Sequence, residues 1–287
     1  MKKLFHRTKS LIHLFSITYT GGSWDKHPYT LDYENDQYRE DELVRILIDA
    51  LPHFALTASE LQELKKTDDF GEMYRKAFSR ISNALPEKKG DYGELLLFLL
   101  LSAFYPAERF VTKVRLRSSL GDQVKGFDCA HFTVEADQIW LWLGEVKFYK
   151  SFSGALSDIV DEIQDHCKAL YLKNEFSILA SNCELNENFP DADKLKSVID
   201  GSTPINQVNI TIPALITYDS STISKHKSRT DKEFIDAMSK EFEKKFQLID
   251  GKKLPHSNNI RVFFLVMPFA SVTNIKQKLH TFESLYR

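Results

Sequence analysis

Two stretches rich in β-branched and aromatic residues, separated by four mostly polar positions, constrain the fold of this sequence most. Residues 127–134 and 139–148 have the composition of strands on a half-buried sheet. Residues 135–138 between them are short enough to form a hairpin turn. A two-residue turn pairs Val134 with Ile139, whereas a three-residue turn would break that register. We therefore expect an antiparallel hairpin near the middle of the chain.

The same register brings charged residues together at the open end of the hairpin. Asp128 falls directly opposite Glu145, where Cβ atoms are roughly 4.5–5.5 Å apart. Like charges repel at that distance, so the two carboxylates favour a cation between them. Because side chains alternate along a strand, Glu145 and Lys147 share a face. Gly126, opposite Lys147, leaves room for the backbone of a ligand.

Two carboxylates beside a lysine suit metal-assisted hydrolysis of a phosphodiester. Magnesium prefers one or two carboxylates, completed by water and phosphate oxygens. The bound metal lowers the pKa of a water ligand and neutralises charge that builds on the phosphate. A neighbouring lysine can orient the attacking water or stabilise that charge. We therefore predict Asp128 and Glu145 as magnesium ligands and Lys147 as the water-orienting cation.

Each of these residues also has a purely structural explanation. Glu-x-Lys at the end of a strand is common, and a solvated strand face usually explains it. Glu94 lies in the first turn of an apolar helix expected over 92–104, where the helix dipole favours a carboxylate. The functional alternative makes Glu94 a third acidic group that reaches the metal or its water. Both explanations of Glu94 stay open, and Glu94 is included here as a candidate catalytic residue.

The spacing of these residues resembles a known nuclease signature. Asp128, followed after sixteen residues by Glu145-Val146-Lys147, is similar to the PD-(D/E)xK motif, with Phe127 in place of the usual proline. Glu94 stands where many members of that superfamily carry another acid. More specifically, GDYGELL, GFDCAHF and GEVKFYKS resemble the HamA family, the nuclease subunits of the Hachiman anti-phage system. The resemblance extends over most of the chain.

This resemblance implies a magnesium-dependent deoxyribonuclease that acts as the effector of a prokaryotic antiviral complex. Its implied partners are DNA and a HamB-like DNA helicase subunit of the same system. The resemblance further implies that the complex restrains the nuclease until invading or damaged DNA is sensed. It also suggests that Gln164, on the helix after the hairpin, helps to position water or substrate, although Gln164 could equally face solvent.

Composition is that of an ordinary globular protein, with 43% hydrophobic and 27% charged residues among 287. No apolar run reaches the roughly 18–20 residues of a membrane span. The basic N-terminus precedes an apolar segment that polar residues interrupt and that no small-residue cleavage site follows. Three cysteines without metal spacing are expected to be reduced, with Cys129 facing away from Asp128. We therefore expect a cytoplasmic protein without a membrane partner.

The net charge of −2 bears on DNA binding. Unaided binding to DNA usually draws on a basic surface that neutralises several phosphates. Lys113 and Arg115 share a face of an expected strand over 109–116 and could contact phosphate, although a solvated edge is the favoured explanation. The balance of charge therefore predicts that the chain alone binds DNA weakly and that a partner delivers the DNA substrate.

Alternating helices and strands predict an α/β fold with a mixed sheet flanked by helices. A helix over 92–104, three strands, a helix over 153–172 and a strand over 176–180 would form the αβββαβ core of the PD-(D/E)xK nucleases. Other expected strands cover 12–19, 208–218 and 260–269, and other helices cover 39–51, 58–66, 70–85, 192–199, 231–248 and 272–286. Residues 24–36 are expected to be irregular. We predict a mixed α/β N-terminal extension over 1–89, or a part of the same domain, and a nuclease-like domain over 90–287.

Two other functions compete with the nuclease. The first is a catalytically silent adaptor whose nuclease-like fold docks a helicase and binds DNA without cutting. The second is a restriction-type subunit, although the sequence contains no recognisable base-reading element. No phosphate-binding loop or His-Glu-x-x-His motif is present, so any ATP hydrolysis belongs to another subunit. His131 and His166 are expected to be packed or hydrogen-bonded rather than to bind metal.

Overall fold

The computed structural model describes residues 1–22, 24–67, 69–112, 127–182, 191–255 and 257–287. Its strands are β1 (Ile12–Leu14), β2 (Asp25–Leu31), β3 (Tyr33–Glu34), β4 (Gln37–Tyr38), β5 (Glu108–Thr112), β6 (Cys129–Glu135), β7 (Gln138–Lys147), β8 (Asn209–Asp219) and β9 (Ile260–Phe269). Within these ranges one sheet has the order β1-β2-β9-β8-β7-β6-β5, and β3 and β4 form a separate ribbon. Strands β2, β9, β8 and β7 run parallel, while β1, β6 and β5 pair antiparallel with their neighbours. The predicted mixed sheet is confirmed.

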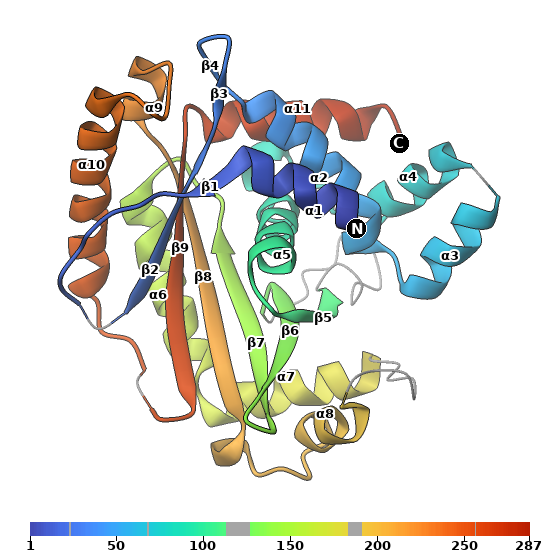
Figure 1. The fold of residues 1–287 in the computed structure, drawn as a ribbon. Helices are drawn as coiled ribbons and strands as arrows, with labels where there is room; N and C mark the ends of the chain where they lie inside the picture. The colour runs from blue at the N-terminus through green and yellow to red at the C-terminus, as the bar shows by residue number, and fades with distance from the viewer. Residues whose placement is uncertain (23, 68, 113–126, 183–190, 256) are drawn as a thin grey trace.

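Helices cover both faces of this sheet, as Figure 1 shows. One face packs against α1 (Lys2–Leu11), α2 (Glu40–Ala55), α5 (Asp91–Phe104) and α11 (Val272–Ser284), with α3 (Ala58–Lys66) and α4 (Phe70–Phe78) extending the same core. The other face packs against α6 (Phe152–His166), α7 (Ala169–Asn182), α8 (Ala192–Ile199), α9 (Ser221–Lys225) and α10 (Lys232–Asp250). Short 3₁₀ turns lie at Pro86–Lys88 and Ile205–Gln207. The architecture is α/β, as predicted.

The central hairpin forms in the predicted register. Val134 pairs with Ile139, and the ladder continues to Cys129 opposite Gly144. The two central turn residues, Ala136 and Asp137, have φ values of 47° and 67°. Positive φ at both positions is the type I′ geometry whose twist matches that of the strands. The two-residue turn therefore fixes which side chains of β7 face which helices.

Helix α5 packs very close to the strand that carries Glu145 and Lys147. A Cβ atom added to Gly93 would lie 2.9 Å from the Cβ of Phe148 and 3.1 Å from Cγ2 of Val146. A Cβ added to Gly144 would lie 2.6 Å from the Cys129 sulfur. Gly93 therefore lets the helix backbone approach β7, and Gly144 leaves room on β7 for the Cys129 sulfur and the Leu97 side chain of α5. This close packing fixes the distance between α5 and the hairpin.

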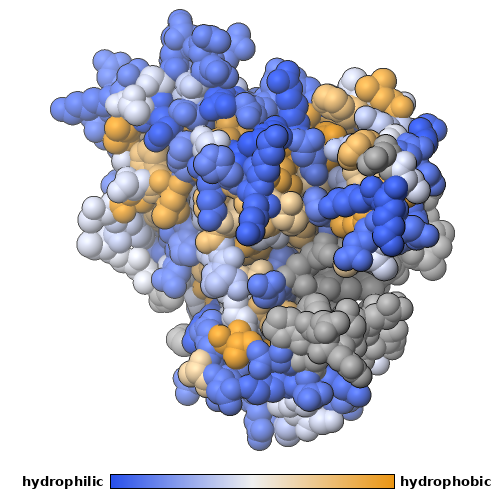
Figure 2. Space-filling view, turned by 45° about the vertical axis from the view of Figure 1, so that its right-hand side comes forward, coloured by the Kyte–Doolittle hydropathy of each residue, from blue (hydrophilic) through white to orange (hydrophobic). Residues whose placement is uncertain are grey.

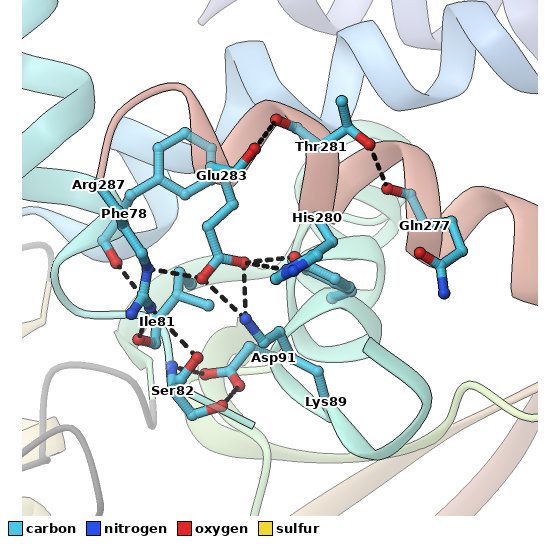
Figure 3. A network of polar contacts seen from close by, with 12 residues as sticks. Phe78, Ile81, Ser82, Lys89, Asp91, Gln277, His280, Thr281, Glu283 and Arg287 are labelled. Atoms are coloured by element: carbon cyan, nitrogen blue, oxygen red, sulfur yellow. Dashed lines mark hydrogen bonds and ion pairs between the residues drawn. The ribbon is translucent and has the colours of Figure 1, made fainter. Parts of the chain in front are cut away.

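A buried network of charges fixes the beginning of α5 to the end of α11 (Figure 3). Both Lys89 and Glu283 are 1% exposed, and Lys89 Nζ lies 2.6 Å from Glu283 Oε2. Arg287 Nε lies 2.7 Å from the other carboxylate oxygen, and the Tyr92 hydroxyl donates to the same carboxylate at 2.5 Å. Burial and the neighbouring carboxylate raise the pKa of Tyr92. The network places the first turn of α5, and with it Glu94.

Several expected elements differ from the structure. Residues 24–36, expected to be irregular, contain β2, which pairs with β9 more than 200 positions later. The expected strand over 176–180 is wrong, because those residues belong to α7, where Leu172 and Phe176 are buried at helical spacing. The single helix expected over 153–172 is also wrong: α6 ends at His166, and Leu170 is 72% exposed. The strand expected over 12–19 ends at Leu14, and the helix expected over 70–85 ends at Phe78.

Other expectations are confirmed. The helix predicted over 58–66 is α3, which begins with a capping box formed by Thr57 and Glu60. The strand predicted over 260–269 is β9, buried on both faces for most of its length. Figure 2 shows hydrophobic residues reaching one face of the molecule in separate groups among hydrophilic ones. In the described parts of the chain, no helix is long and apolar enough to cross a membrane.

Candidate active site

The orientation of Glu145 and Lys147 follows from the alternation of side chains along β7. Trp140, Trp142, Val146 and Phe148 pack into the core under α5, and Ile139, Leu141 and Leu143 pack into the core under α6. Glu145 and Lys147 continue the second series, so they point toward α6. Glu145 is 1% exposed and the Lys147 side chain is 12% exposed. The two residues share a face, as predicted.

Asp128 lies beside Glu145 but is held differently from a ladder residue. The regular ladder ends at Cys129, and the Asp128 backbone N–H donates to the Gly144 carbonyl oxygen at 2.9 Å. The Asp128 carboxylate accepts a hydrogen bond from the Val146 backbone N–H at 2.8 Å. Asp128 was predicted to pair directly with Glu145. In the structure it instead hydrogen-bonds to the backbone of Gly144 and Val146, the residues on either side of Glu145. This contact fixes the buried carboxylate against the strand that carries the other two residues.

The ammonium group of Lys147 is paired with α6. Lys147 Nζ lies 2.5 Å from Glu162 Oε2, and the Glu162 side chain is 40% exposed. Burial alone would lower the pKa of Lys147, but the ion pair with Glu162 and the charges of Asp128 and Glu145 raise it above its ordinary value. The lysine is therefore held as a cation next to the carboxylates.

The carboxylate of Glu145 contacts His166, the last residue of α6. His166 Nδ1 lies 2.5 Å from Glu145 Oε1. The imidazole stacks on the Tyr171 ring, with centroids 4.1 Å apart, and meets the edge of Phe127 at 4.9 Å. Two aromatic side chains thus fix the ring that orients Glu145. His166 is hydrogen-bonded, as predicted, and its partner is a candidate site residue.

Glu94 lies in the first turn of α5, on the face of the sheet opposite the one that Glu145 and Lys147 share. Its side chain is buried, with 4% of the residue exposed. Burial raises the pKa of the Cys129 thiol well above its usual range, and the charges of Asp128, Glu145 and Glu94 raise it further. All three carboxylates therefore act on one sulfur atom. Cys129 itself packs in the core under α5, away from the face of Asp128, as predicted.

Asp128 and Glu145 are the residues of this group that could hold a metal ion. Among the described residues, no group of three or more His, Cys, Asp or Glu side chains is arranged to hold a metal ion. Asp128 and Glu145 supply two buried carboxylates, and magnesium commonly takes its remaining ligands from water and phosphate. The oxygen donors present therefore suit this ion.

The family of the chain is decided by comparison with known families. The HamA family model matches residues 8–282, which include the hairpin and the strands at both ends of the sheet. The chain belongs to the HamA family. HamA is a component of the Hachiman defence system. No curated protein matches the chain.

The sequence interpretation of this HamA chain missed two contacts from α6: Glu162 with Lys147, and His166 with Glu145. Asp158, Glu162 and His166 recur at intervals of four, beside the apolar stripe that packs on the sheet. That polar stripe was the available signal, since residues four apart share one side of a helix. Gln164, the residue suggested by resemblance, is exposed and donates to the Lys253 carbonyl oxygen at 2.8 Å.

Some expected contacts cannot be placed. Gly126, predicted opposite Lys147, and the possible phosphate-contacting residues Lys113 and Arg115 lie outside the described residues. His131 is fully buried, with Nδ1 3.4 Å from the Ala107 carbonyl oxygen and its ring near Phe98. The expectation that His131 is a packed histidine is confirmed, and its contact with Phe98 places it on the α5 face of the sheet.

Proposed function

We propose that this HamA-family chain is a magnesium-dependent deoxyribonuclease of the PD-(D/E)xK type and acts with the DNA helicase of its defence system. The observation that carries the proposal is the grouping of Asp128, Glu145 and Lys147 at one end of the central hairpin. Two buried carboxylates beside a buried cation are costly unless they bind something or pair with one another. A metal-bound phosphodiester complements this arrangement of charges.

The order of the elements supports the same proposal. Helix α5, strands β5, β6 and β7, helix α6 and strand β8 follow one another as α, β, β, β, α and β, with α7 and α8 inserted before β8. Strand β8 runs parallel to β7 and takes the place of the strand expected over 176–180. Glu94 lies on the first helix of this series, Asp128 directly precedes the second strand, and Glu145 and Lys147 lie on the third.

Each residue has a distinct role in the proposed reaction. Asp128 and Glu145 would hold the magnesium ion, which when bound supplies an acidified water and charge neutralisation on the phosphate. Lys147 orients the attacking water and stabilises negative charge on the phosphate. Glu162 positions the Lys147 ammonium, and His166 positions the Glu145 carboxylate. Glu94 adds a negative charge from the α5 side and acts as an auxiliary acid.

A catalytically silent adaptor is the second candidate, and one observation favours it. The side chains of Glu145 and Lys147 both make ion pairs or hydrogen bonds within the chain, as structural residues do. In that case the nuclease-like fold would dock the helicase and bind DNA without cutting. The same ion-pair contacts are compatible with a nuclease that stays restrained outside its complex.

The two candidates are separated by plasmid cleavage with the purified chain, alone and with its helicase, in magnesium or EDTA. Lys147→Ala is compared with Lys173→Ala, which removes an exposed lysine of α7. The nuclease predicts magnesium-dependent cutting that only Lys147→Ala abolishes, with helicase binding retained by both variants. If no preparation cuts DNA while both variants bind helicase and DNA, the adaptor is correct. Cutting that survives Lys147→Ala would show that the site residues are wrongly assigned.

A further inference from the structure

A cavity of about 310 Å³ lies at the carboxyl end of β7, outside the group of residues around Asp128. It is bounded on one side by the segment that follows β7 and on the other by the first turns of α11. Ligand pockets in proteins have volumes from about 300 Å³ upward, so the cavity is large enough for a small molecule. The proposed cleavage reaction does not use the residues that line this cavity.

The position of the cavity in the sheet is one where open α/β proteins bind ligands. Strands β7, β8 and β9 run parallel, so their carboxyl ends lie at the same edge. The helices that follow β7 and β8 pack on one face, and α11, which follows β9, packs on the other, as Figure 1 also shows. Where the helices that follow neighbouring parallel strands pack on opposite faces, a crevice is left outside the carboxyl ends of the strands.

A buried lysine supplies the most unusual group of the lining. Lys276 on α11 is 6% exposed, and its ammonium donates to the Glu87 carbonyl oxygen at 3.1 Å. The ammonium lies 5.4 Å from the centroid of the Phe148 ring. Within the described part of the chain, no carboxylate forms an ion pair with Lys276. Burial lowers the pKa of Lys276, although the charge of Glu87 partly offsets this effect.

The rest of the lining combines an apolar floor with a polar rim. Phe148, Val272 and Pro86 are buried and apolar. Lys150, Ser151, Thr273 and Gln277 are exposed at the rim and supply one further positive charge and several hydrogen-bond donors. The exposed Glu87 also lines the rim, where its carboxylate accepts a hydrogen bond from Gln277 and offsets the charge of Lys150. A buried ammonium is stabilised by an anion, and a flat apolar group fits against an aromatic floor. A ligand that has both parts matches the cavity.

We propose that this cavity binds a nucleoside phosphate, with the phosphate at Lys276 and the base against Phe148 and Val272. The nucleotide is either free or part of a nucleic-acid strand, and both forms present the same chemistry to the cavity. The binding itself does not depend on the proposed cleavage.

The test is calorimetric titration of the full chain with 2′-deoxyadenosine 5′-monophosphate in EDTA, where the proposed cleavage cannot proceed. Wild type should bind this nucleotide saturably and bind deoxyadenosine at least about tenfold more weakly, since deoxyadenosine lacks the phosphate that the Lys276 ammonium would bind. Lys276→Met should lose at least about tenfold in affinity. Lys278→Met, on the same helix but exposed and paired with Asp41, is the matched control and should bind as wild type does.

A second variant and a second probe complete the test. Thr273→Trp at the exposed rim should block entry without disturbing the core. A short single-stranded oligonucleotide with a 5′-phosphate should show the same dependence on Lys276 if the site serves a strand, and should not bind if it serves a free nucleotide. Equal affinity of wild type and Lys276→Met for both probes, or no binding by folded wild type, would overturn the proposal.

Discussion

The Asp128 carboxylate accepts a hydrogen bond from the backbone N–H of Val146, at 2.8 Å, and so ties β6 to the middle of the Glu-Val-Lys segment. Asp128 is therefore both a proposed metal ligand and a structural acceptor. The two roles can be separated, because an asparagine side chain keeps an acceptor oxygen but lacks the charge.

Asp128→Asn should keep the fold and abolish cleavage, while Asp128→Ala should lose both cleavage and stability. In the alanine variant the buried Val146 N–H is left without this acceptor, which costs about 1–3 kcal/mol of unfolding free energy. The asparagine variant should remain within about 1 kcal/mol of wild type. Urea unfolding with plasmid cleavage measures both effects. Equal destabilisation by the two substitutions would argue against the structural role of this hydrogen bond.

Glu162→Gln should reduce cleavage about 10- to 100-fold, because Glu162 positions the Lys147 ammonium. The Glu162 side chain is 40% exposed, so the change in unfolding free energy should stay below about 1 kcal/mol. Asp161→Gln, one position away on α6, is the control and should cleave as wild type does. A wild-type cleavage rate for Glu162→Gln would remove Glu162 from the site.

Glu283→Ala should destabilise the protein by about 3–5 kcal/mol, because it leaves the buried Lys89 ammonium without its ion pair. Replacing both partners, as Glu283→Leu with Lys89→Met, should restore much of that loss, since the buried Lys89 ammonium is then no longer left unpaired. Chemical unfolding of the three proteins measures the difference. If the single substitution costs less than about 1 kcal/mol, the network does not anchor α5.

The capping box of α3 predicts a pH dependence of stability. The pKa of Glu60 is lowered to about 2: burial raises it, but the hydrogen bond from Thr57 and the ion pair with Arg80 outweigh burial. The ordinary pKa of a glutamate is 4.5, so the stabilisation is complete above that pH and is lost as pH falls toward 2. Glu60→Gln should lower unfolding free energy by about 1 kcal/mol at pH 7, because the pair is partly solvated. The difference should vanish near pH 2, and a constant difference would contradict the assignment.

The hairpin could be predicted from the sequence because its information is local. The β-branched residues, the short turn and the alternation of side chains fix the register, and the register places Glu145 and Lys147 on one face. The proximity of Asp128 follows from the same pairing. The apolar strand β9 and the amphipathic helix α10 also have local patterns, and the sequence predicts a strand over 260–269 and a helix over 231–248.

What could not be predicted depends on contacts between distant segments. Strand β2 contains a proline and a histidine and is strand-like because it pairs with β9, far along the chain. The partners of Glu145 and Lys147 come from α6. The polar stripe marks one side of this helix, but which strand residues that side meets depends on how α6 packs across the sheet. The apolar run at 176–180 suited strand or helix, and packing within α7 decided it.

The central claim is tested most directly by the magnesium dependence of plasmid cleavage by the Hachiman complex that contains Glu145→Gln. Glu135→Gln, on the same hairpin and paired with Arg261 on the surface, is the matched control. The account predicts that the control cuts DNA as wild type does in magnesium, and that Glu145→Gln does not cut at any magnesium concentration while remaining folded and bound to the helicase. Undiminished cutting by Glu145→Gln would contradict it.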